Sequence, residues 1–136
     1  MANEYGLTCS VQLSDKKDCV IINVKGNITI EFVQQYLTEA HNLGREYNIR
    51  KFLIDVTQAK SLLGLDNIYS LLHVKQRKDG IYNTKAVTAL LTDPNDHSHD
   101  HVEIIAQNHG LRFKKFTKNV DAMKYLADWE LGRAHV

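Results

Sequence analysis

Cysteine, proline and long apolar runs are all scarce in this 136-residue sequence, which has two cysteines and one proline. No apolar stretch approaches the roughly 20 residues that a helix needs to cross a bilayer. The N-terminal residues carry neither the basic start nor the apolar stretch of a secretory signal. Neither charge is in large excess, with 17 Lys and Arg against 16 Asp and Glu. We therefore expect a cytoplasmic protein with no membrane span and no general attraction to nucleic acid.

The two cysteines, Cys9 and Cys19, flank a charged turn over residues 14–18. If those residues form the turn of a hairpin, Leu13 faces Cys19, and Cys9 lies well away along its own strand. The distance then excludes a disulfide, and two free thiols suit a reducing cytosol. A zinc site built on a Cys-x-x-Cys pair is excluded as well, because the sequence contains no such pair.

Hydrophobic periodicity divides the chain into alternating strands and helices. The segments with strand patterns are 8–13, 19–25, 51–56, 85–92 and 111–116. The segments with helical spacing run from an N-cap at Thr29 to near Asn48, from Asp66 to Gly80, from about Val102 to a C-cap at Gly110, and onward from about Asn119. The only proline, Pro94, falls in the loop after the fourth strand. Gly26-Asn27 is expected to end the second strand.

The order is therefore strand, strand, helix, strand, helix, strand, helix, strand, helix. Repeated strand–helix–strand units need crossover connections, which make the joined strands parallel, whereas the N-terminal hairpin adds an antiparallel strand. We predict an α/β fold with a mixed, mostly parallel five-stranded sheet and about four helices. A chain of this length buries one core, and no linker or repeat interrupts it. We expect a single domain over residues 1–136.

Four short motifs occur in a characteristic order between about Leu7 and Trp129. They are Gly26-Asn27-Ile28-Thr29 before the first helix, Phe52-Leu53-Ile54-Asp55 closing the third strand, Ala106 through Arg112, and Phe116 followed by Asp121 through Leu126. In this order and spacing the chain resembles the STAS domain, and more narrowly its SpoIIAA-like branch of small stand-alone bacterial proteins. The resemblance implies a non-enzymatic module without a cofactor. It implies binding of a protein partner, a second copy included, or in some branches of a small apolar or lipid-like ligand.

Signalling members of that family carry a phosphorylated serine at the start of the second helix, just after an Asp. Counted from Asp55, the pair falls here on Leu63-Gly64, neither of which can accept a phosphate. Ser61 lies three residues earlier, and a shift in the loop would bring it to the entrance of the helix. The resemblance thus implies partner binding here without the usual phosphorylation site.

The segment Ala59 to Leu65 is apolar, contains a glycine, and lies between a strand end and a helix. Ligands of open α/β sheets bind at such edges. Our candidate partner- or ligand-binding residues are Ser61, Leu62, Leu63, Gly64, Leu65, Asp66 and Tyr69. Two interpretations remain open for the leucines. They form an exposed partner surface or the mouth of an apolar pocket, or they are a plug that closes the core.

The string from His97 to His101 contains three histidines and an aspartate, so His97, His99 and His101 are weak candidates for zinc or nickel ligands. Metal sites need rigidly held ligands, whereas these residues follow Pro94 in a loop. We favour a polar helix entrance with Asp96 or Ser98 as N-cap and solvated imidazoles. His109 is expected to bond terminal carbonyls of its helix.

No catalytic template is complete. Asp55, Thr92 and Lys114 or Lys115 imitate part of a response-regulator phosphorylation site, but that site needs acidic metal ligands after the first parallel strand, where Lys25 stands. The sequence also has no Gly-x-Ser-x-Gly, Gly-x-Gly-x-x-Gly or Gly-x-x-x-x-Gly-Lys motif. We therefore predict a binding protein rather than an enzyme.

Overall fold

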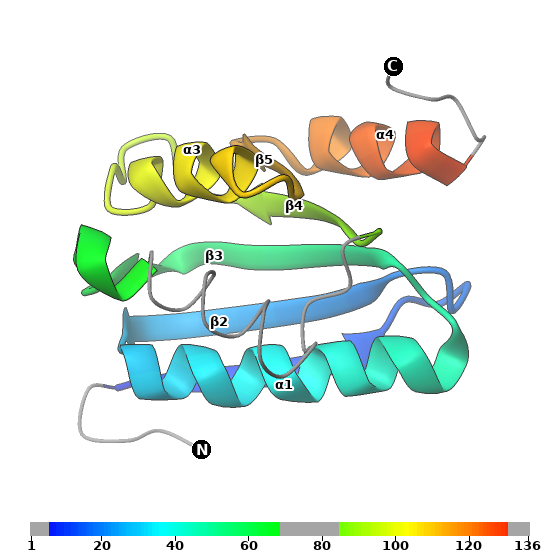
Figure 1. Ribbon diagram of the computed structural model, residues 1–136, viewed down its shortest axis with the longest axis horizontal. Helices are drawn as coiled ribbons and strands as arrows, with labels where there is room; N and C mark the ends of the chain where they lie inside the picture. Colours follow the sequence, from blue (N-terminus) through cyan, green and yellow to red (C-terminus); the bar gives the residue numbers. More distant parts are fainter. Residues whose placement is uncertain (1–5, 69–84, 131–136) are drawn as a thin grey trace.

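The computed structural model describes residues 6–68 and 85–130 (Figure 1). Its elements are β1 (Thr8–Leu13), β2 (Val20–Ile28), α1 (Ile30–Tyr47), β3 (Lys51–Ser61), β4 (Val87–Leu91), α3 (Asp100–Asn108), β5 (Arg112–Phe116) and α4 (Asn119–Glu130). The predicted order is confirmed for these elements. A further helix begins at Leu65 and is described as far as Ile68; the rest of the predicted Asp66–Gly80 helix lies outside the described residues.

The strands form one sheet in the order β1-β2-β3-β4-β5. β1 and β2 are antiparallel, and every other neighbouring pair is parallel, which confirms the predicted mixed α/β sheet. The physical cause is the one expected from the sequence: a hairpin joins the first two strands, and crossovers join the rest. No helix in the described part of the chain is long and apolar enough to cross a membrane.

The hairpin register differs from expectation by one residue. Leu13 pairs with Val20, whereas Cys19 lies opposite Ser14, whose backbone N–H donates to the Cys19 carbonyl at 2.9 Å. The Ser14 hydroxyl also donates to the Asp18 carboxylate at 2.8 Å, which tightens the turn. Both cysteines are free thiols, and burial raises the pKa of Cys9 to about 11 and that of Cys19 to about 12.

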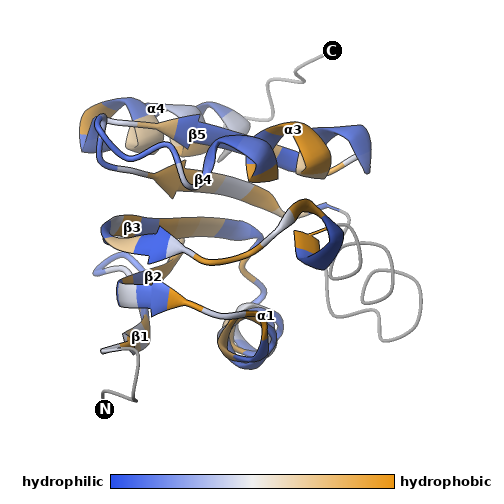
Figure 2. Ribbon diagram, turned by 90° about the vertical axis from the view of Figure 1, so that its left-hand side faces the viewer, coloured by the Kyte–Doolittle hydropathy of each residue, from blue (hydrophilic) through white to orange (hydrophobic). Residues whose placement is uncertain are grey.

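Helices cover the two faces of the sheet unequally. Viewed from the side, α1 and α3 lie on one face and α4 on the other (Figure 2). Successive side chains of β3 point to opposite faces of the sheet, so the strand contributes to the core on both sides. Ile54 packs in the core beneath α1, whereas its neighbour Leu53 packs with Ala122 and Leu126 of α4. α4 contacts β4 and β5, so the face of β1 and β2 away from α1 carries polar side chains such as Ser10, Lys25 and Asn27.

β3 and β2 are both longer than predicted. β3 was expected to end near Val56 but continues to Ser61, and β2 runs past Gly26 to Ile28. The pairing register shifts by one residue between Asn23 and Lys25, so this bulge lets the two strands remain paired to their ends. The extension carries Ser61 to the carboxyl edge of the sheet.

Gly26 is required at its position by close packing. It has a φ of +103°, and a Cβ there would overlap the carbonyl oxygen of Gly6, where the chain enters β1. A glycine that was expected to end a strand therefore lies inside one.

Candidate partner-binding site

Hydrogen bonds hold the backbone of the loop that follows β3. The N–H of Leu62 donates to the carbonyl of Ile28 at 3.0 Å, and that of Leu63 donates to the Ser61 hydroxyl at 3.1 Å. The N–H of Gly64 donates to the side-chain oxygen of Asn67 at 3.0 Å. These bonds fix the loop and start the next helix at Leu65, with Gly64 as its N-cap.

The leucines of this loop divide between the two interpretations. Leu62 is 56% exposed and Leu65 is 48% exposed, whereas Leu63 turns inward and packs against the core beneath α1. The segment is thus exposed to solvent at Leu62 and Leu65, whereas Leu63 helps to close the core. Asp66 is exposed beside Leu65, and Tyr69 lies outside the described residues.

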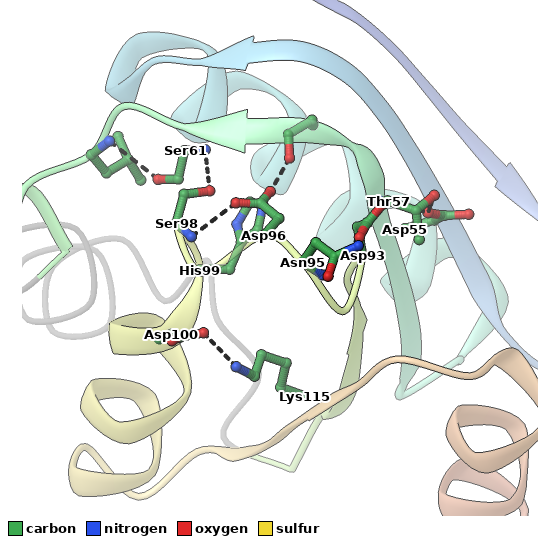
Figure 3. A network of polar contacts seen from close by, with 12 residues as sticks. Asp55, Thr57, Ser61, Asp93, Asn95, Asp96, Ser98, His99, Asp100 and Lys115 are labelled. Atoms are coloured by element: carbon green, nitrogen blue, oxygen red, sulfur yellow. Dashed lines mark hydrogen bonds and ion pairs between the residues drawn. The ribbon is translucent and has the colours of Figure 1, made fainter.

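A second loop, residues 92–99 between β4 and α3, is bonded to the end of β3 (Figure 3). The N–H of Ser61 donates to the Ser98 hydroxyl at 2.9 Å. The Nε2 atom of His99 lies 2.9 Å from the carbonyl oxygen of Ala59 and 3.5 Å from the Asp96 carboxylate. Because a carbonyl oxygen only accepts, Nε2 carries the hydrogen in this contact. The 92–99 loop therefore supports the end of β3, which leads into the loop that carries the exposed leucines.

The three candidate metal ligands are not brought together. His99 is only 5% exposed and uses Nε2 on Ala59, so the expectation of solvated imidazoles is wrong for this residue. His97 is 78% exposed and bonds Asp100 at 3.1 Å, while His101 is exposed on α3. Among the described residues, no group of three or more His, Cys, Asp or Glu side chains is placed to hold a metal ion.

The start of α3 also differs from expectation. His99 occupies the N-cap position without a capping side-chain bond, whereas the Asp96 carboxylate accepts the N–H of Ser98 at 2.9 Å in the turn before it. Burial alone would raise the pKa of Asp96, but the hydrogen bonds from Ser98 and the nearby His99 hold it below its usual range. At the other end of the helix, His109 Nδ1 bonds the Ile105 carbonyl at 2.8 Å, as predicted.

Three side chains of α3 reach β5, the strand at the edge of the sheet. Asp100 pairs with the Lys115 ammonium at 2.6 Å, Glu103 accepts the Lys115 N–H at 2.7 Å, and Gln107 donates to the Phe113 carbonyl at 2.7 Å. The hydrogen bond from Lys115 is the main cause that lowers the pKa of Asp100. Lys115 is thus occupied on the α3 face. Asp55 accepts the N–H and the hydroxyl of Thr57, two residues along the same strand, at 3.0 and 2.7 Å.

An apolar cavity of about 110 Å³ lies between the sheet, α1 and α3. Its walls include Leu63 together with the aromatic side chains Tyr36, His41 and Phe52. The ring of His41 lies 4.5 Å from that of Phe52, and burial, with a smaller contribution from Arg45, lowers the pKa of His41 to about 4. Tyr36 is buried, and that burial is the main cause that raises the pKa of its hydroxyl group.

Sequence reasoning missed Tyr36 and His41 as cavity residues. The signal was present, because both fall on the buried stripe of α1 with Val33, Ala40 and Gly44, at the spacing of three and four residues that defines one helix face. The bracing role of Ser98 and His99 had no comparable signal, since it depends on contacts with a strand about forty residues earlier.

No family model matches the chain, and no curated protein matches its sequence. Solved structures do match its fold. An anti-sigma factor antagonist from Mycobacterium paratuberculosis has a TM-score of 0.60 at 12% identity, covering 94% of this chain and 100% of that one. A DUF3478-family protein with a SpoIIAA-like fold from Shewanella loihica has a TM-score of 0.56 at 18% identity, covering 93% and 98%. The anti-sigma factor antagonist SpoIIAA, in its unphosphorylated form, has a TM-score of 0.51 at 12% identity, covering 94% and 100%. The chain therefore has the predicted STAS, SpoIIAA-like fold.

Proposed function

We propose that this chain, with its SpoIIAA-like fold, is a non-enzymatic regulatory module of the bacterial cytoplasm that binds a protein partner through residues 61–66. The observation that carries the proposal is the pair of exposed leucines, Leu62 and Leu65, on a loop whose backbone is already fixed by hydrogen bonds. A preorganised loop loses little conformational entropy on binding, so burial of the two side chains contributes more of its free energy to affinity.

The comparisons favour a protein partner. Two of the similar structures are described as anti-sigma factor antagonists, and this chain covers their full length. At the N-cap of the helix that follows β3 this chain has Gly64, which has no hydroxyl group. We therefore propose that its partner binding is not switched by phosphorylation at that position.

The test compares proteins retained by the wild-type chain with those retained by Leu62→Asp and by Ile104→Asp. Ile104 is a matched control, because it is 58% exposed but belongs to another element, α3. We expect a partner that binds the wild type and the Ile104 variant. With that partner purified, Leu62→Asp should weaken the affinity about 30-fold, which corresponds to a loss of about 2 kcal/mol. The proposal fails if folded Leu62→Asp and Leu65→Asp bind every such protein as tightly as the wild type.

The cavity supports a second candidate function, the carriage or sensing of a small apolar ligand. An apolar cavity of about 150 Å³ can hold a benzene molecule, so this smaller space sets a narrow limit on size. Tyr36, one of the lining residues, has a hydroxyl group that can make a polar contact with such a ligand. Native mass spectrometry should then detect an added small mass on the 15.6 kDa chain, which disappears after denaturation. A clean mass from several fresh preparations would count against this second function.

A further inference from the structure

The two edge strands of the sheet are protected very differently. An edge strand presents unpaired backbone N–H and C=O groups to which another strand can add. On β5 the outward N–H of Lys115 and the outward carbonyl of Phe113 are occupied by the side chains of Glu103 and Gln107. β5 also carries Lys114 and Lys115, and charged edges resist pairing. This edge is closed to strand addition.

β1, at the opposite edge, has none of these protections within the described part of the chain. Its six residues, Thr-Cys-Ser-Val-Gln-Leu, include no charged residue and no proline. Its register with β2 is continuous from Thr8 to Leu13, without a bulge. Figure 2 shows β1 at the end of the stack of strands, and among the elements described no helix or strand lies beyond it.

The hairpin fixes which backbone groups of β1 point outward. The N–H of Ser14 bonds the carbonyl of Cys19, so alternate residues counted back from Ser14 bond β2. The residues between them, Cys9, Val11 and Leu13, direct their N–H and C=O groups away from the sheet. No residue in ranges 6–68 and 85–130 bonds these outward groups.

The side chains of β1 are apolar on one face of the sheet and polar on the other, a pattern that an added strand could extend. Cys9, Val11 and Leu13 are half-buried against the core beneath α1, and Ser10 and Gln12 are exposed on the polar face. A strand added beside β1 would cover the remaining apolar surface of the first set if it repeated the same alternation.

We infer that β1 pairs antiparallel with β1 of a second copy of the chain, about a two-fold axis near Val11. This strand matches itself, because antiparallel pairing about that axis sets apolar side chains beside apolar ones and brings no like charges together. The two five-stranded sheets become one continuous sheet. The contact lies on another element than residues 61–66, so it neither requires nor prevents the proposed partner binding.

The charged groups near β1 are compatible with the pairing. Burial, and after it the charge of Glu39 on α1, raises the pKa of Cys9, so Glu39 lies near the start of β1. Pairing about Val11 brings the partner's hairpin turn to that end. The turn, residues 14–18, carries two lysines and two aspartates and is neutral overall.

The first test is the mass of the full chain in solution, measured by sedimentation over a wide concentration range. We expect a species of twice the 15.6 kDa monomer. Val11→Pro removes the outward N–H without breaking a bond to β2, and should shift the protein to the monomer. Val11→Ile keeps that N–H and should remain dimeric. A monomer at every concentration, or a dimer that folded Val11→Pro does not weaken, would overturn the inference.

The second test needs no substitution and holds even if Val11→Pro fails to fold. Amide hydrogen exchange followed by NMR should protect Ser10 and Gln12 at all concentrations, because they bond β2. Val11 and its two outward neighbours should gain protection only as the dimer forms. A dimer whose Val11 amide exchanges as fast as that of the monomer would place the interface elsewhere.

Discussion

The imidazole of His99 and the carbonyl of Ala59 lie 2.9 Å apart although forty residues separate them in the sequence. Ala59 belongs to the part of β3 beyond the bulge, the part that carries Ser61 and the exposed leucines to the edge of the sheet. His99 therefore links the loop before α3 to the strand that positions the candidate partner surface. A histidine that suggested a metal ligand in the sequence is a buried structural contact.

We predict that His99→Phe lowers the free energy of unfolding by about 1–3 kcal/mol, because the buried Ala59 carbonyl loses a donor. His99→Gln, whose side-chain amide can still donate to that carbonyl, should lose less. Urea unfolding followed by circular dichroism measures both. Equal losses for the two variants would mean that ring packing, rather than the hydrogen bond, is what His99 contributes.

Truncation should lower stability much more at Leu63 than at Leu62. Leu63→Ala removes a side chain that packs against the core, and should cost about 1–2 kcal/mol of stability, less than a fully buried leucine. Leu62→Ala should change stability by no more than about 0.5 kcal/mol, because Leu62 is exposed. Chemical denaturation of the two variants gives the comparison. A large loss for Leu62→Ala would show that it supports the core.

The stability of the protein should fall with acidification before its carboxylates titrate. Burial lowers the pKa of His41 from 6.5 to about 4, so between these values the unfolded chain binds a proton that the folded chain excludes. Stability therefore decreases as pH falls through this window, by up to about 3 kcal/mol. His41→Phe should flatten the dependence between pH 6.5 and pH 4.5. Urea midpoints at several pH values test this, and an unchanged slope would contradict it.

Asp96 and Asp100 affect stability in a separate pH range, below the one in which His41 acts. Hydrogen bonds hold the pKa of each carboxyl group below its ordinary value of 3.8. Their contribution to stability is therefore complete above that value and is lost as pH falls through the lower, folded pKa. They should not contribute to the slope that His41 produces.

Alanine substitutions at Gly26 and Gly110 can distinguish the cost of steric overlap from the cost of backbone strain. Both have positive φ, but a Cβ on Gly26 would overlap the Gly6 backbone, whereas a Cβ on Gly110 would meet nothing within 4 Å. Gly110→Ala should therefore cost about 1–2 kcal/mol, from the left-handed conformation alone. Gly26→Ala should cost about 1–3 kcal/mol more, or prevent folding. Thermal unfolding of the two variants tests which loses more stability. Equal losses would show that the backbone around Gly6 shifts to accommodate the added Cβ.

The element order was predictable because each element carries its own local signal. The alternation in β1, the apolar run of β2 and the helical stripe through Val33 and Ala40 are read within one segment, and the connections then decide which strands are parallel. The ends of β2 and β3 were not predictable in this way. Gly26 suggests a strand end locally, but a bulge and a close approach to Gly6 keep it inside the strand.

The sequence by itself determined the mixed five-stranded α/β fold and the segment that holds the candidate partner surface. Only the tertiary structure decided that Leu62 and Leu65 face outward while Leu63 faces inward, that His99 is buried, and that β5 is closed while β1 is open. The reason is physical: periodicity assigns a residue to one face of its own element, whereas its burial and its hydrogen bonds depend on what distant segments place against that face.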